Sequence, residues 1–112
     1  GEHDFSAFRA TSCTARTPQR HLYRLAIRRY AERLVFVLCA NGFLQHMARN
    51  IVGTLVMIGR GQRPTSAMAT ILQSRQRQQA GPTAPAHGLF LVRVVYDATG
   101  HTPCASLLAS CV

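Results

Sequence analysis

The segment that most constrains the fold is residues 40–61, which is typical of one mostly apolar helix. Its apolar side chains recur at the spacing of a single helix face. Gly59-Arg60-Gly61 then provides a stop signal, since glycine commonly ends helices. The face predicted to be buried consists of Leu44, Met47, Ala48, Ile51, Leu55 and Ile58.

The opposite side of this helix carries a single arginine, Arg49, together with Gln45, His46, Asn50 and Gly53. No Asp or Glu occurs from Arg33 to Tyr96. A guanidinium held against an apolar helix needs an anion to satisfy it. From the residues alone, Arg49 is either a solvated arginine, a structural partner of Asp4, or a group whose anion comes from another molecule. Gly53 lies one turn further on and leaves room beside Arg49 for a chain segment or a ligand.

The segments around the helix predict a small sheet. Residues 21–30 alternate, with Tyr23, Leu25 and Ile27 on one face and basic residues on the other, which is typical of a half-buried strand. Residues 34–39 are apolar on both faces and are expected to form a central strand, paired with the first as a hairpin. A second helix is expected to begin near Pro64. Residues 89–96 predict a third strand, whereas the tail, 98–112, shows no clear element.

The predicted order is therefore β-β-α-α-β. It indicates an α+β (α/β) domain whose antiparallel-leaning sheet has its helices on one face. Three strands make a thin sheet, and both apolar strands need cover on two sides, which suggests a missing neighbour.

Composition narrows the possible partners. The 112 residues carry a formal charge of +9, and all 13 basic residues are Arg. Such an excess favours RNA, DNA or an anionic membrane surface. No apolar run approaches the roughly 20 residues needed to cross a membrane. The apolar helix is also a poor DNA-recognition helix, which leaves RNA as the favoured partner.

The cysteines do not predict a metal site. Cys13, Cys39, Cys104 and Cys111 form no Cys-x-x-Cys pair, and His residues are scattered. We therefore expect free thiols in a reducing cytoplasm. The first residues, Gly-Glu-His-Asp-Phe, show no signal-peptide pattern and no initiator Met, so the chain is expected to be a piece of a longer protein.

Four motifs, in order, resemble one family. They are Gly-Glu-His-Asp-Phe-Ser-Ala-Phe-Arg (1–9), Arg-Thr-Pro-x-Arg (16–20), Ala-Asn-x-Phe-Leu-x-His-Met-x-Arg-Asn-Ile-Val-Gly (40–53) and Ala-Gly-Pro-Thr-Ala-Pro-Ala-x-Gly-Leu (80–89). The chain resembles the C-terminal half of the bacterial TruA-type tRNA pseudouridine synthases over residues 1–97. Residues 98–112 form an unmatched tail.

The resemblance implies an enzyme, a tRNA pseudouridine synthase that isomerises a uridine of the anticodon stem-loop. It implies that Arg49 pairs with a nucleophilic aspartate. That aspartate belongs to an Arg-Thr-Asp-x-Gly motif, which is absent here. The chain alone is therefore expected to be inactive until it is joined by an N-terminal half.

The resemblance also implies further contacts. RNA-binding residues are expected at Ser12, Cys13, Thr14, Ala15, Arg16 and Arg20, and Gly88 and Leu89 are expected to form an apolar pocket wall. Neither a cofactor nor a metal is required, the full-length form is expected to be a homodimer, and the location is expected to be cytoplasmic. The alternative from another class is a truncated, non-catalytic RNA-binding module.

Overall fold

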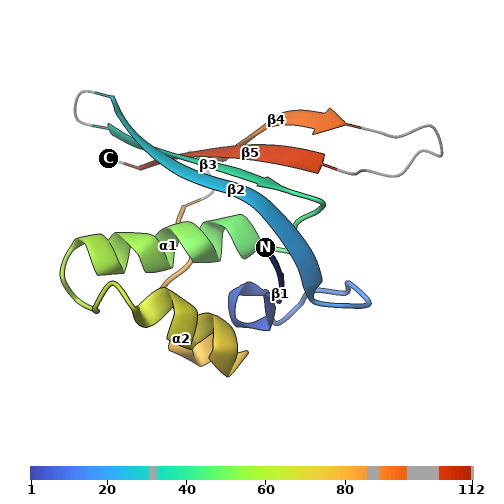
Figure 1. Ribbon diagram of the computed structural model, residues 1–112, viewed down its shortest axis with the longest axis horizontal. Helices are drawn as coiled ribbons and strands as arrows, with labels where there is room; N and C mark the ends of the chain where they lie inside the picture. Colours follow the sequence, from blue (N-terminus) through green and yellow to red (C-terminus); the bar gives the residue numbers. More distant parts are fainter. Residues whose placement is uncertain (31–32, 86–88, 96–103, 112) are drawn as a thin grey trace.

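The computed structural model describes residues 1–30, 33–85, 89–95 and 104–111 (Figure 1). At residues 30, 33, 90–95 and 104–111 it defines the backbone alone. The elements, in chain order, are β1 (Glu2–Asp4), the 3-10 turn η1 (Ser6–Phe8), β2 (Gln19–Tyr30), β3 (Arg33–Ala40), α1 (Met47–Gly59), α2 (Ala67–Ser74), the 3-10 turn η2 (Arg77–Gln79), β4 (Leu89–Val95) and β5 (Cys104–Cys111).

The strands form one five-stranded sheet in the order β1-β2-β3-β5-β4, and every neighbouring pair is antiparallel. Both helices lie on the same side of this sheet (Figure 1). The predicted hairpin of the first two long strands is confirmed, with Leu25 opposite Leu38 and Ile27 opposite Phe36. The α+β class and the antiparallel sheet with helices on one face are therefore confirmed.

The prediction that the tail contains no element was wrong, because β5 lies inside the sheet between β3 and β4. The short first strand, β1, was missed as well, so the predicted β-β-α-α-β order lacks its first and last strands. The β5 sequence, Cys-Ala-Ser-Leu-Leu-Ala-Ser-Cys, contains no β-branched residue, so its intrinsic strand propensity is low. Its pairing with two neighbours, β3 and β4, supplies what propensity does not.

The core lies between the sheet and α1. Its largest fully buried apolar side chains are Phe8, Phe36, Leu38, Met47, Ile51 and Val52. Helix α1 begins at Met47, later than the predicted segment 40–61. The predicted apolar stripe is buried at Leu44, which precedes α1, and at Met47, Ala48 and Ile51, and it is partly buried at Leu55 and Ile58. Helix α2 begins at Ala67 rather than near Pro64, because Pro64 opens a turn whose carbonyl accepts a bond from the Ala67 N–H, 3.0 Å away.

The expected burial of one β2 face did not occur. The exposed fractions of Tyr23, Leu25 and Ile27 are 53%, 37% and 48%. The helices cover the face of β3 and leave much of β2 open. A β-bulge between Leu22 and Arg24 also breaks the predicted alternation at Tyr23. In the described part of the chain, no helix is both long and apolar enough to span a bilayer.

Candidate active site at the start of helix α1

Arg49 lies in the first turn of α1 and is half-buried. Its side-chain Nε donates a hydrogen bond to the Ala84 carbonyl, 2.8 Å away. The Ala84 N–H in turn donates to the Arg49 carbonyl, 3.0 Å away. The backbone and the side chain of Arg49 are therefore both tied to residues 80–85, the segment that runs along α1 toward β4.

Two glycines allow this segment to lie directly against the helix. A Cβ atom on Gly53 would lie 1.7 Å from the Pro82 carbonyl oxygen, a distance no side chain tolerates. A Cβ atom on Gly81 would lie 2.6 Å from Met57 Sδ and 2.9 Å from Thr54 Cα. The space predicted beside Arg49 at Gly53 is thus filled by another segment of the same chain.

Asn50 is the centre of a buried hydrogen-bond network behind Arg49 and is 1% exposed. Its Nδ2 donates to the Phe8 carbonyl at 2.8 Å. Its Oδ1 accepts bonds from Thr83 Oγ1 at 2.6 Å and from Arg77 Nη2 at 3.1 Å. One side chain, adjacent to Arg49 in the sequence, thus joins η1, η2 and the 80–85 segment to α1.

Two further groups complete the network. Thr54 Oγ1 donates to the Asn50 carbonyl and accepts from the Gly81 N–H, both at 2.8 Å. Arg77 Nη1 donates to the Gly81 carbonyl at 2.9 Å. No role was predicted for Asn50 or Thr54 from the sequence. The signal that could have found them is the presence of two polar residues, four apart, on a helix otherwise rich in apolar side chains.

The structure excludes Asp4 as the partner of Arg49. Asp4 instead forms an ion pair with Arg75, with 3.7 Å between Oδ2 and Nε. Within the described ranges, neither Nη atom of Arg49 has a hydrogen bond or an ion pair. A positive charge in a fixed orientation is therefore left with two nitrogens for an anion, which is suited to bidentate binding of a carboxylate or phosphate.

Asp4 is ionised for local reasons. Desolvation by burial raises its pKa, but the hydrogen bonds from the Ser6 hydroxyl and the Ser6 N–H, with the charges of Arg75 and Arg9, outweigh that effect. The net result lowers the pKa of Asp4 below its ordinary value of 3.8. This carboxylate helps to shape the turn between β1 and η1 and lies outside the Arg49 network.

The predicted RNA-binding residues form a loop that lies beside the residues just before α1. Ser12 Oγ donates to Gln45 Oε1 at 3.3 Å, and the Ala10 N–H donates to the Gln45 carbonyl at 3.0 Å. The loop is braced from inside by Arg9, whose Nη2 donates to the carbonyls of Cys13 at 3.2 Å and Ala15 at 2.6 Å. The fold therefore brings this loop to the same end of α1 as Arg49.

The members of this loop differ in exposure. Ser12, Thr14 and Arg16 are exposed, whereas Cys13 and Ala15 are half-buried. Arg20 Nη1 donates to the carbonyls of Thr17 and Gln19, at 2.9 and 2.7 Å, so this arginine also braces the entry into β2.

Cys13 is a free thiol with an altered acidity. The pKa of Cys13 is lowered, first by a hydrogen bond with the Ala15 backbone and then by one with the Gln45 backbone, assisted by Arg9. The Cys13 thiol therefore lies close to the backbone of both Ala15 and Gln45.

The remaining predicted residues lie further along the chain. Gly88 falls outside the described residues. Leu89 begins β4, is half-buried and packs against the core. His46 is exposed and adopts a left-handed conformation (φ 62°) directly before α1, so it lies at the turn into the helix and outside the buried network.

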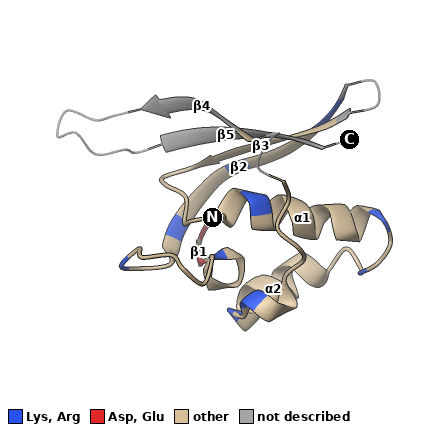
Figure 2. Cartoon of the chain, turned by 180° about the vertical axis from the view of Figure 1, so that it is seen from behind, with Lys and Arg blue, Asp and Glu red and all other residues tan. Residues whose placement is uncertain are grey.

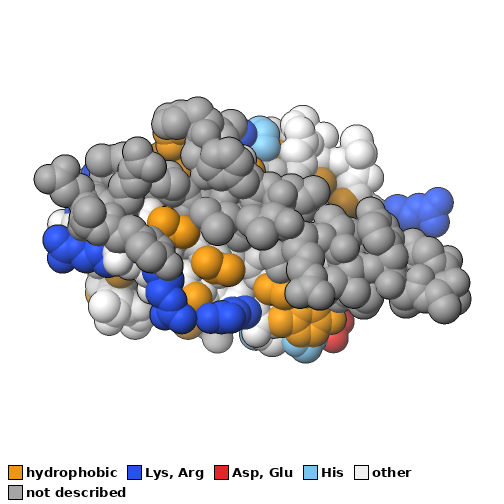
Figure 3. Space-filling model, turned by 90° about the horizontal axis from the view of Figure 1, so that it is seen from above, with side chains coloured by type: hydrophobic (Ala, Val, Ile, Leu, Met, Phe, Trp, Pro, Cys, Tyr) orange, Lys and Arg blue, Asp and Glu red, His pale blue; other side chains and the backbone are white. Residues whose placement is uncertain are grey.

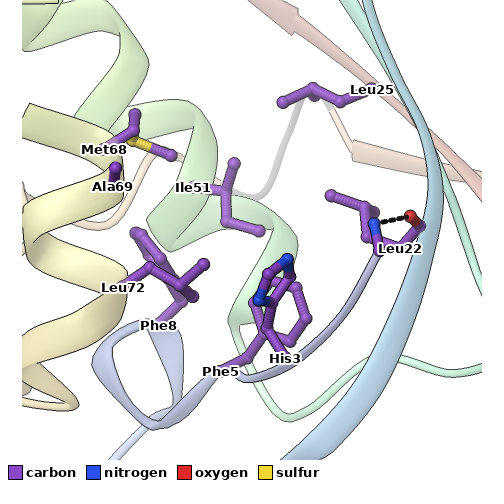
Figure 4. A pocket seen from close by; sticks show the side chains of 10 residues that line it. His3, Phe5, Phe8, Leu22, Leu25, Ile51, Met68, Ala69 and Leu72 are labelled. Carbon is purple, nitrogen blue, oxygen red and sulfur yellow. Dashed lines mark hydrogen bonds between the residues drawn. The ribbon is translucent and has the colours of Figure 1, made fainter. Parts of the chain in front are cut away.

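A separate apolar pocket of about 200 Å³ lies between β2 and the two helices (Figure 4). It is lined by Phe5, Phe8, Leu22, Leu25, Ile51, Leu72 and neighbouring residues, with His3 at its side. Arg49 is not among its lining residues. Since His3 is its one titratable side chain, the pocket offers little chemistry, and the start of α1 is the better candidate site.

Comparisons with known proteins identify the family to which the chain is similar. The sequence profile of the family described as tRNA pseudouridine synthase matches residues 1–97. The chain is 49% identical over 107 residues to a tRNA pseudouridine synthase A of Burkholderia multivorans, covering 96% of this chain and 40% of the relative. It is 50% identical over 96 residues to the protein of that name from Paraburkholderia xenovorans, covering 86% of this chain and 36% of the relative. The chain thus spans about 40% of the length of these relatives.

Proposed function

Because the chain belongs to the tRNA pseudouridine synthase family, we propose that it forms the C-terminal part of such an enzyme, one that isomerises uridine to pseudouridine in the anticodon stem-loop of tRNA. The four motifs of residues 1–89 support this position in the family. In the reaction, the bond between the sugar and N1 of uracil breaks, the base turns, and C5 is joined to the sugar instead. C5 then loses its proton and N1 gains one, so the product is an isomer of the substrate. The target base leaves its stack to be reached.

The role we assign to Arg49 is to pair with the nucleophilic aspartate of the N-terminal half. The single observation that supports it is the guanidinium whose Nε is held by Ala84 at 2.8 Å while its Nη atoms have no partner among the described residues. A carboxylate bound to those nitrogens would be kept ionised by charge and hydrogen bonding. The network of Asn50, Thr83 and Arg77 keeps the arginine in place, and a site on a rigid element is what such pairing requires.

The loop containing Ser12–Arg16 would bind the tRNA backbone. Its exposed members, Ser12, Thr14 and Arg16, offer hydroxyls and one exposed guanidinium, which are common phosphate contacts. Leu89, and Gly88 before it, would lie near the uracil. No cofactor enters the chemistry. The full-length enzyme would act as a homodimer in the cytoplasm, where the free thiols of Cys13 and Cys39 are stable.

The test joins the chain to its proposed partner. This chain and the N-terminal half of the Burkholderia multivorans relative are co-expressed, and pseudouridine in tRNA is measured by mass spectrometry. We expect modification only when both are present. Arg49→Ala should lower the rate about 10²-fold or more, the loss typical of removing one preorganised charged group, while tRNA binding changes little. Arg60→Ala, at the exposed end of α1, is the matched control.

The second candidate function is a truncated RNA-binding module without chemistry, which the basic composition favours. It becomes the better description if the co-expressed halves associate and bind tRNA but form no pseudouridine. A binding defect of Arg49→Ala as large as its loss of activity would instead assign Arg49 to a phosphate.

A further inference from the structure

Strand β2 presents a second surface, on the side of the sheet away from the helices. Residues directly opposite each other on antiparallel strands share a face. Leu25 and Ile27 pair with the buried Leu38 and Phe36 and therefore face the helices. Arg24 and Arg28 pair with Cys39 and Val35 and face the other way. The helix-free face of β2 is thus its basic face.

The bulge in β2 adds an aromatic platform to this face. Leu22 pairs with the buried Ala40, so its neighbour His21 points to the helix-free side. The ring of Tyr23, the extra residue of the bulge, is stacked on His21, with centroids 4.4 Å apart and planes at 26°. Tyr23 is 53% exposed. A flat aromatic surface therefore lies open to solvent next to Arg24.

The charge of the surface is positive. Arg24 and Arg28 are both exposed, and within the described residues neither guanidinium has a hydrogen bond or ion pair. They are four residues apart, or about 13 Å along a strand. Among the described residues, Glu2, opposite His21, is the one acid that the sheet register places beside them. Figure 3, which views this side of the molecule, shows arginine side chains bordering a patch of hydrophobic ones.

The described acidic residues are confined to one end of the molecule, whereas the arginines are spread over it. Arginines occur on both the sheet and the helical layer, whereas the two acids of the described residues both lie in β1 (Figure 2). Among the described residues, the acids that would repel an anionic partner therefore lie at the β1 end of the surface. The predicted RNA-binding loop, Ser12–Arg16, leads directly into β2, so the two surfaces follow each other along the chain.

We propose that His21, Tyr23, Arg24 and Arg28 bind an unpaired stretch of RNA, with one base stacked on Tyr23 and the flanking phosphates on the two arginines. This inference rests on the proposed function in so far as the RNA is the substrate tRNA. An exposed aromatic ring accepts any base through its π-face, and Arg suits phosphate, which together are the usual elements of single-strand recognition. A duplex, whose bases are stacked already, gains only the phosphate contacts.

The test measures binding by the complete 112-residue chain, using fluorescence anisotropy with two probes: an RNA hairpin with an unpaired loop and a blunt RNA duplex of the same length. Tyr23→Ala should weaken hairpin binding about tenfold and duplex binding much less. Tyr23→Phe should bind like the original protein. Arg24→Gln and Arg28→Gln should each reduce the slope of log affinity against log salt by about 1.

Two controls match these variants. Ile27→Ala removes an exposed apolar side chain from the same strand on the opposite face, and Arg60→Gln removes an exposed charge at the end of α1. Equal hairpin binding by Tyr23→Ala and Ile27→Ala overturns the proposal, as does a Tyr23→Phe loss equal to that of Tyr23→Ala. Because the assay reads binding alone, its outcome is independent of whether Arg49 supports catalysis in the joined enzyme.

Discussion

The surroundings of Arg49 on α1 and the helix-facing side of β2 differ in how closely they are packed. Around Arg49, the 80–85 segment lies so close to α1 that only glycine fits at positions 53 and 81, and the buried polar atoms there have partners. Along the helix side of β2, Leu25 and Ile27 remain more than a third exposed although they pair with fully buried residues of β3. One region is closed by the chain itself, and the other is left open.

The difference indicates which region requires a fixed side-chain position. A charged group can act on a partner carboxylate only if its position is fixed, and close packing with satisfied hydrogen bonds is what fixes it. An exposed apolar edge has no such requirement, since single exposed apolar side chains are ordinary. Substitutions in the two regions should therefore differ strongly in their cost.

The largest effect is expected from Gly53→Ala. The added methyl would occupy the place of the Pro82 carbonyl, so the segment must move and the Arg49–Ala84 bonds must break. Overpacking against backbone should cost about 3 kcal/mol of unfolding free energy or more, measured by chemical denaturation. Gly59→Ala is the control: nothing lies within 4 Å of its Cβ position, and it should stabilise the helix by up to about 1 kcal/mol. Equal effects would contradict the close approach.

Asn50→Ala should have the next largest effect. It removes the acceptor of Arg77 and Thr83 and leaves the Phe8 carbonyl without its donor. Unsatisfied buried groups cost about 1–3 kcal/mol each, so the free energy of unfolding should fall by about 2–3 kcal/mol. The exposed Asn41, which accepts from the His21 N–H at 2.8 Å, provides a comparison: Asn41→Ala should cost about 1 kcal/mol. Similar losses for both variants would show that the hydrogen-bond network around Asn50 contributes no more stability than one exposed hydrogen bond.

A smaller, pH-dependent effect is expected from Asp4. Because the folded state lowers its pKa below 3.8, its ionised form stabilises the fold above that pH, and this stabilisation is lost as the pH falls through the folded-state pKa. Asp4→Asn should cost about 1 kcal/mol near neutral pH and flatten the acid side of the stability profile. Thermal melts across that range provide the measurement. An unchanged acid profile would show that another carboxyl group controls it.

The smallest effect is expected from Ile27→Thr, on the open edge of β2. The side chain is 48% exposed, and Thr keeps the β-branched shape that strands favour. The free energy of unfolding should change by no more than about 0.5 kcal/mol. A loss above 2 kcal/mol in the same denaturation experiment would show that Ile27 is packed rather than open.

Much of the helical layer could be predicted from the sequence. The 3.6-residue spacing of apolar side chains identified α1, and its end at Gly59 coincides with the predicted stop, followed by Gly61 at φ 77°. The hairpin of β2 and β3 followed from two adjacent apolar runs. Local pattern is sufficient in these cases because each segment carries its own periodicity.

β1 and β5 could not be predicted, because neither has a local pattern. β1 is three mostly polar residues and β5 is rich in small ones, so both exist through pairing with strands far away in sequence. The site likewise depends on contacts between segments that are distant in the sequence. Arg49 was identified from its motif and its lack of acids, but its partner Ala84 lies 35 residues away.

The sequence by itself determined that this protein has an apolar helix with an isolated arginine, a basic charge and the motifs of a tRNA pseudouridine synthase family member. These are properties of composition and local order. Only the tertiary structure decided that Asp4 pairs with Arg75, that residues 80–85 hold Arg49, and that the bulge stacks Tyr23 on His21. Those outcomes depend on which distant segments meet, and that is set by long-range packing and pairing.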